Sequence, residues 1–150
     1  MLATAEASPV ASTDQLLALQ QECRKGYVDP ALVQHAVRWV SATRDPARHG
    51  LPELAKYLSS GASTRASIGL IEAGRALGFL RGRPYVLPQD LTDIAPDVLR
   101  HRLVLSYEAL ADGQTPDGLV RRLLQHLPAP PKPLDSHVRV DRPVAEAAAA

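Results

Sequence analysis

Residues 61–67 read Gly-Ala-Ser-Thr-Arg-Ala-Ser and place an arginine in the first turn of an expected helix. A helix N-terminus carries a partial positive charge, so it normally favours acidic side chains over basic ones. A bound phosphate would compensate Arg65, because backbone N–H groups and a guanidinium both match phosphate oxygens. The segment therefore indicates phosphate binding, unless Arg65 is a solvated surface residue or pairs with Glu53 or Glu72.

Other kinds of chemistry have little support in the sequence. There is no G-x-x-x-x-G-K-[ST] motif, no G-x-G-x-x-G motif after a strand and no H-E-x-x-H motif. Ser63 lies in a partial match to a serine nucleophile elbow, but Arg65 stands where the closing glycine belongs. The lone Cys23 excludes an internal disulfide, and the five histidines lack metal-ligand spacing. We expect no catalytic residue in this chain alone and no metal site.

The charges of the chain nearly cancel, with 17 basic and 16 acidic residues, so bulk attraction to nucleic acid or anionic lipid is not expected. Six arginines nevertheless support a rival hypothesis, a stand-alone helical module that binds protein or nucleic acid and has no nucleotide role. Ion pairs with Asp93, Asp97 and Glu108 are the competing explanation for these arginines. The six are Arg81, Arg83, Arg100, Arg102, Arg121 and Arg122.

The elements that must position these side chains are helices. The chain is 45% hydrophobic but only 4% aromatic, so its core must consist of Ala, Leu and Val, which favours an all-α bundle of about six helices. We expect this bundle over residues 13–127, with a flexible segment at 1–12 and a flexible Pro/Ala-rich tail at 128–150. No signal peptide or membrane-spanning run is recognisable, so the expectation is a soluble cytoplasmic protein with no membrane contact.

Apolar spacing predicts the first helix over 14–25, ended by Gly26. One face of this helix carries Leu16, Leu19 and Cys23. Asp29 and Pro30 fit the N-cap and first position of the second helix. The buried stripe of the second helix is expected to contain Leu32, Val33, Ala36, Val37 and Val40.

The longest helix is expected to start at Ser63 as its cap and to run to about Arg81. Glycines at 69, 74 and 78 each weaken a helix, so close packing against another helix is the expected compensation. The apolar face of this helix is expected to contain Ala66, Gly69, Leu70, Ala73, Leu77 and Leu80.

Prolines mark the remaining helices. A short helix follows Pro52 and ends before Gly61, and Pro88 and Pro96 open two further short helices. Thr115 caps the last helix, which begins at the next residue, Pro116. Residues 85–87 and 103–105 are expected to be short extended segments.

Several of these segments together form a recognisable pattern. They are residues 27–30 (YVDP), 42–46 (ATRDP), 61–67 (GASTRAS), 76–90 (ALGFLRGRPYVLPQD) and 98–103 (VLRHRL). In this order they resemble the C-terminal lid subdomain of MoxR-type AAA+ ATPases. The resemblance covers about residues 13–127 and implies the helical fold of an AAA+ lid.

The resemblance also implies a role for the 61–67 segment. In this family the arginine of a G-A-S-P-R-A motif is the sensor 2 residue, which reaches the γ-phosphate of the nucleotide, and by position it falls on Arg65. Ser63, Thr64 and Ala66 would lie at the helix N-terminus near the nucleotide. Thr64 replaces the usual proline of the motif; both residues suit a first helical turn.

The cofactors and partners that the resemblance implies belong to a complete AAA+ module. The Walker A, Walker B, sensor 1 and arginine-finger segments of the family precede the lid and do not occur in this sequence. ATP and Mg²⁺ are therefore expected only in the complete module, and the isolated chain is not expected to be an enzyme. The implied partners are an α/β core domain in the same or another chain, a hexameric ring and von Willebrand factor A domain proteins, in chaperone-like remodelling.

Overall fold

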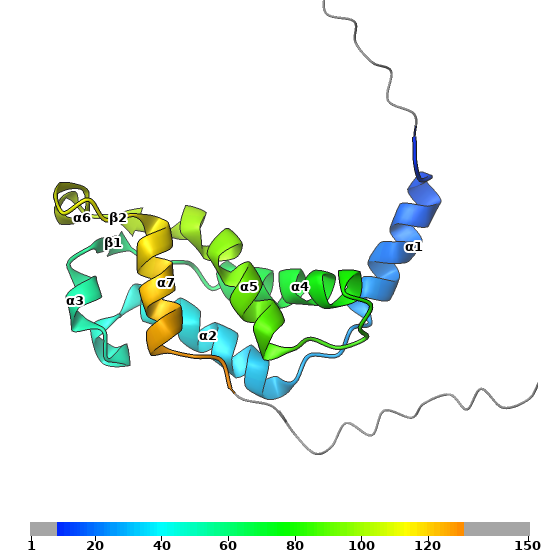
Figure 1. Cartoon of the computed structure of the whole chain (residues 1–150), viewed down its shortest axis with the longest axis horizontal. Coiled ribbons are helices and arrows are strands. Elements are labelled where there is room, and N and C mark those ends of the chain that lie inside the picture. Colours follow the sequence, from blue (N-terminus) through cyan, green and yellow to red (C-terminus); the bar gives the residue numbers. More distant parts are fainter. Residues whose placement is uncertain (1–8, 131–150) are drawn as a thin grey trace, which may run out of the picture.

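The computed structural model describes residues 9–130, which form a mostly helical domain (Figure 1). In this range the α-helices are α1 (Thr13–Arg24), α2 (Pro30–Arg44), α3 (Pro52–Ala55), α4 (Arg65–Leu80), α5 (Pro88–Leu99), α6 (Tyr107–Ala111) and α7 (Pro116–His126). Two 3-10 turns, η1 (Ala47–His49) and η2 (Arg100–Arg102), and two short strands, β1 (Leu58–Ser60) and β2 (Val104–Leu105), complete the described elements. The predicted all-α bundle is confirmed, with a small antiparallel sheet added.

Capping residues fix two helix starts as predicted. The carboxylate of Asp29 accepts a hydrogen bond from the Ala31 N–H at 2.8 Å, with Pro30 in the first helical position of α2. The hydroxyl of Thr115 likewise accepts from the Gly118 N–H at 3.1 Å at the start of α7. Both caps satisfy backbone donors that a helix start leaves without a partner.

The core lies where α4 and α5 pack on each other and on α2 and α7. Gly74 allows the close helix packing expected from the sequence, whereas Gly78 allows close approach of the segment before α5. A Cβ on Gly74 would lie 2.6 Å from Leu91 Cδ2, and one on Gly78 would lie 3.0 Å from the carbonyl oxygen of Tyr85. The apolar face expected for α4 is partly wrong, because Leu80 is 80% exposed while the two glycines are buried.

The first helix departs from its prediction. It extends away from the rest of the domain (Figure 1), and none of its residues is buried, so Leu16 and Leu19 are each about half exposed. The predicted helix end is confirmed: α1 ends at Arg24, Lys25 is its C-cap and Gly26 follows directly, although Gly26 does not adopt a positive φ. The expected apolar stripe of α2 is also only partly buried, since Val33 and Val37 face solvent.

The single short helix predicted over residues 52–60 is wrong, because this segment contains a helix and a strand. Helix α3 stops at Ala55, and β1 pairs with β2 in an antiparallel register that places Leu58 opposite Leu105. The backbone carbonyl of Tyr57 accepts from the Ser106 N–H at 3.0 Å, which extends the link between these segments. The sheet confirms an extended segment at 103–105, and Tyr85 forms an isolated parallel bridge with Tyr27.

Pro96 does not open a separate helix but lies inside α5. A proline within a helix removes one N–H donor, here the one that would bond the Thr92 carbonyl. The helix around Pro96 is held by Ala95, Val98 and Leu99, which are all buried. Packing of these side chains therefore outweighs the loss of one hydrogen bond.

Candidate functional site

The segment before α4 is attached to the end of α2 by a close backbone contact. A Cβ on Gly61 would lie 2.2 Å from the Thr43 carbonyl oxygen and 2.4 Å from its carbonyl carbon, so only glycine fits. The Ala62 N–H donates to Thr43 Oγ1 at 2.9 Å, and this hydroxyl donates to the Val40 carbonyl at 2.7 Å. Thr43 is 1% exposed. A role for Thr43 was not predicted, because its partner is distant in the sequence.

Buried alanines then fix the orientation of the first turn of α4. Ala62 and Ala66 are fully buried, whereas Ser63, Thr64 and Arg65 are exposed. The structure therefore brings three of the four predicted site residues to the surface together. The fourth, Ala66, contributes no side chain to that surface, and its N–H already donates to the Ser63 carbonyl at 2.9 Å.

The start of α4 has no side-chain cap, which corrects the prediction for Ser63. Thr64 occupies the N-cap position with helical backbone angles (φ −57°, ψ −25°), and neither hydroxyl caps the helix. Ser63 instead accepts through its backbone carbonyl. The Ala66 and Ser67 N–H groups donate to the Ser63 and Thr64 carbonyls at 2.9 and 3.1 Å, which leaves the Arg65 N–H as the donor at this helix end that can meet an outside acceptor such as a phosphate oxygen.

Arg65 makes no ion pair with any acid in the described part of the chain. The two partners considered from the sequence are not used, because Glu72 pairs with Arg75 at 2.8 Å and Glu53 does not reach Arg65. Beside the helix start runs an open groove of about 470 Å³ between α2 and α4. The groove carries charges of both signs together with apolar and hydroxyl groups. Its lining is Val37, Val40, Ser41, Arg44, Asp45, Thr64 and Ser67.

Three of the six arginines behind the rival hypothesis are engaged in ion pairs. Arg81 contacts Asp90 and Asp93 at 2.7 and 2.6 Å. Arg100 contacts Asp97 at 2.6 Å and Asp117 at 3.3 Å. The predicted pairs with Asp93 and Asp97 are thus confirmed, while Glu108 forms none among residues 9–130. Arg102, Arg121 and Arg122 form no ion pair among residues 9–130, so ion pairs account for half of this set.

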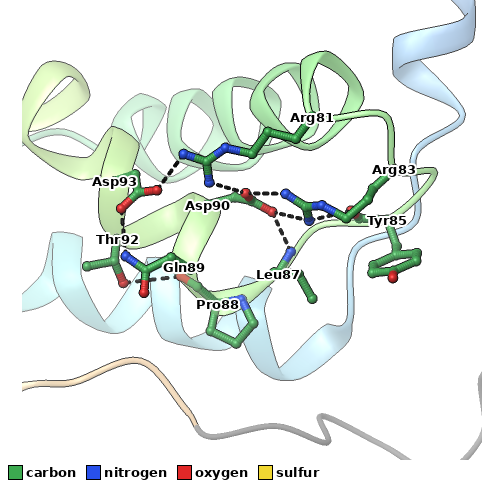
Figure 2. Close-up of polar contacts among 9 residues, drawn as sticks. All are labelled: Arg81, Arg83, Tyr85, Leu87, Pro88, Gln89, Asp90, Thr92 and Asp93. Carbon is green, nitrogen blue, oxygen red and sulfur yellow. Dashed lines mark hydrogen bonds and ion pairs between the residues drawn. The ribbon is translucent and has the colours of Figure 1, made fainter.

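The carboxylate of Asp90 is the centre of the densest polar cluster (Figure 2). Its side chain is fully buried and accepts from Arg81, from both terminal nitrogens of Arg83 and from the Leu87 N–H, each at 2.7 Å. Burial alone would raise the pKa of Asp90, but these donors outweigh it and hold the pKa below its usual value. All acceptor positions face protein donors, so the cluster joins α4 to α5 and offers no site for a ligand.

Residues 9–130 offer neither a metal-ligand cluster nor a membrane-spanning helix. No three histidine, cysteine, aspartate or glutamate side chains come together there to hold a metal ion. No helix in that range has the length and apolar character needed to cross a bilayer. The helix start at Arg65 is therefore the strongest candidate site in the described part.

The domain is similar to parts of several known proteins. The AAA lid domain family matches residues 53–123. Chaperone MoxR1 of Mycobacterium tuberculosis is 46% identical over 125 residues, which are 83% of this chain and 33% of that protein. Protein MoxR of Paracoccus denitrificans is 33% identical over 110 residues, 69% of this chain and 32% of that protein.

A solved structure supports the fold directly. The crystal structure of a "putative ATPase" from Cytophaga hutchinsonii superposes with a TM-score of 0.76 at 36% identity, covering 79% of this chain and 36% of that one. The chain thus spans about a third of the length of these relatives.

Proposed function

Because this chain belongs to the AAA lid domain family and is homologous to the C-terminal region of MoxR proteins, we propose that it is a nucleotide-responsive lid. In this proposal the lid docks on a separate α/β core and presents Arg65 to the γ-phosphate of ATP bound there. ATP and Mg²⁺ are held by the complete module. The observation that carries the proposal is an exposed arginine at an uncapped helix start that pairs with no acid of residues 9–130.

The geometry explains how Arg65 could report the state of the nucleotide. Gly61 and Thr43 tie the segment before α4 to the end of α2, and buried Ala66 ties the first turn to the core. In this proposal, a displacement of Arg65 moves α4 and α2 together, because the segment before α4 is held by these contacts. Rigid-body rotation of such a unit is an established way to couple ligand state to movement of a domain.

The complete assembly is also part of the proposal. MoxR1 is named a chaperone, and by homology we extend chaperone-like remodelling to the assembly in which this lid acts. A hexameric ring of core and lid, with von Willebrand factor A domain proteins as partners, completes it.

The test joins this chain to the α/β core of a MoxR-type ATPase and measures ATP hydrolysis. Arg65→Ala should lower turnover by about tenfold or more, because arginines that engage the transferring phosphoryl group contribute strongly to its stabilisation. Arg65→Lys should rescue turnover only partly, since an ammonium lacks the planar fork. The thermal midpoint should change little, because Arg65 is exposed.

The matched control is Arg121→Ala. Arg121 is an exposed arginine on α7 and makes no ion pair in the described part of the chain. Arg75 is unsuitable, because its Nε donates to the Gly26 carbonyl at 3.1 Å and holds the segment between α1 and α2. Equal turnover of the Arg65→Ala and Arg121→Ala proteins would refute the proposed role of Arg65.

A further inference from the structure

Arg102 differs from the paired arginines of the domain. Its Nη1 donates to the Val98 carbonyl and lies 2.6 Å from Nε2 of His101. Among residues 9–130 no carboxylate pairs with it. One nitrogen therefore fixes the guanidinium, while the Nη2 and Nε hydrogens have no protein acceptor in that range. The side chain is positioned, yet most of its donors are unused.

These unused donors face helix α4. Arg102 Nη2 lies 3.9 Å from the position that a Cβ on Gly69 would occupy. Any longer side chain at residue 69 would compete for this space. The glycine thus lets the guanidinium rest against the backbone of α4, one turn after the helix start.

Arg65 and Gly69 are four residues apart and so lie on the same face of α4. Side chains at this spacing have Cβ atoms about 5–6 Å apart, so the two guanidinium groups can reach a common ligand. The next acid on this face, Glu72, is engaged by Arg75 at 2.8 Å. Arg65 of α4 and Arg102 of η2 therefore bring two positive charges to this part of the surface, and neither forms an ion pair among residues 9–130. Such a pair is favourable when an anion bridges it.

We propose that Arg65 and Arg102 together bind the polyphosphate group of a nucleoside triphosphate. This inference rests on the proposed function of Arg65 and adds a second phosphate-binding arginine to the lid. Adjacent phosphates of a triphosphate present several oxygens, which suit two guanidinium forks approaching from one side. His101 acts as a positioning residue, because its Nε2 helps to orient Arg102 Nη1.

A purely structural role for Arg102 predicts different behaviour. Its Nη1 bond to the Val98 carbonyl satisfies an acceptor in the last turn of α5, as basic residues often do. If that were its whole role, substitution would change the thermal midpoint and leave anion affinity unchanged. Anion affinity is therefore the quantity to measure.

The experiment titrates sodium tripolyphosphate into the 15N-labelled 150-residue chain and follows backbone amide shifts in α4 by NMR. We expect saturable shifts over residues 64–69 that weaken with added salt. Arg102→Gln and Arg65→Gln should each weaken affinity by about fivefold or more, because charge-assisted hydrogen bonds are lost. Arg121→Gln, the matched control on α7, should bind as the unmodified chain does. Unchanged affinity of the Arg102→Gln protein, or no saturable shift at all, overturns the proposal.

A second pair of variants leaves Arg102 in place. Gly69→Glu puts a carboxylate beside Nη2 of Arg102, where it should compete with the added anion and weaken binding. Gly69→Gln has nearly the same shape without the charge and should bind more tightly than the Gly69→Glu protein. Equal affinities of these two proteins would overturn the proposal. That result would leave the sensor role of Arg65 standing, because the ATPase measurement of Arg65→Ala tests it separately.

Discussion

At the scale of single residues, the Asp90 carboxylate determines which neighbouring arginines are held in ion pairs. Because Asp90 binds both Arg81 and Arg83, those two arginines are structural. Arg65 and Arg102 have no comparable acid among the described residues and keep their charge available. The sequence cannot distinguish arginines that pair with an acid from arginines that do not, because the difference depends on which side chains meet in the folded chain.

Asp90→Asn should destabilise the domain by about 2 kcal/mol or more, because it leaves two guanidinium groups without their buried partner. Arg81 is 41% exposed, so water screens part of this effect and keeps it below that of a fully buried pair. Urea denaturation at pH 7 measures the difference. Glu53→Gln, at an exposed acid with no ion pair in the described range, is the control and should change stability little.

The same cluster predicts a pH dependence. The pKa of Asp90 is lower in the folded chain than in the unfolded chain, so its stabilisation is present above the unfolded value near 3.8 and is lost as pH falls through the folded value. The stability difference between the unmodified chain and Asp90→Asn should therefore shrink when urea denaturation is repeated below about pH 4. A difference that stays constant from pH 7 to pH 2 would contradict this assignment.

At the scale of elements, the contact between α2 and the segment before α4 positions the candidate site. Gly61→Ala would force a Cβ to within 2.4 Å of both carbonyl atoms of Thr43, and backbone cannot move aside as a side chain can. Overpacking of this kind costs about 1–3 kcal/mol. We expect a lower thermal midpoint and shifted amide signals over residues 62–66.

Gly69→Ala is the matched control for Gly61→Ala. The new Cβ would meet Val98 Cγ1 at 3.4 Å, an ordinary contact, and alanine is favoured over glycine in a helix by up to about 1 kcal/mol. The midpoint of this variant should stay the same or rise slightly. Equal losses of stability for the two substitutions would show that the contact between Gly61 and Thr43 is not tight.

At the scale of the whole molecule, the chain corresponds to about a third of the relatives it matches. Its 150 residues include no phosphate-binding loop. We therefore predict that the purified chain does not hydrolyse ATP in the presence of Mg²⁺. Phosphate release that co-purifies with the chain and requires Mg²⁺ would contradict this prediction.

The N-terminal and C-terminal segments also concern the molecule as a whole. Residues 1–8 and 131–150 lie outside the described part of the structure, so the expectation of flexible ends at 1–12 and 128–150 stays a prediction.

Features that depend on near neighbours along the chain could be predicted from the amino-acid sequence. The caps at Asp29 and Thr115 each use an acceptor and a donor within three residues, and helix hydrogen bonds span four. The resemblance of residues 61–67 to a family motif likewise predicts a role for Arg65 from a short segment, and that role stays a prediction. The fold class and the candidate site could therefore be predicted before any tertiary contact was known.

Contacts between segments that are distant in the sequence became known only from the structure. The Ala62 to Thr43 hydrogen bond spans 19 residues, and the bond from Ser59 to the Leu105 carbonyl spans 46. Helical spacing could not show that α1 leaves its apolar face half exposed, or that Arg102 lies over Gly69. The physical reason is that a local pattern fixes which face of a helix is apolar, whereas burial and pairing depend on which other segment reaches that face.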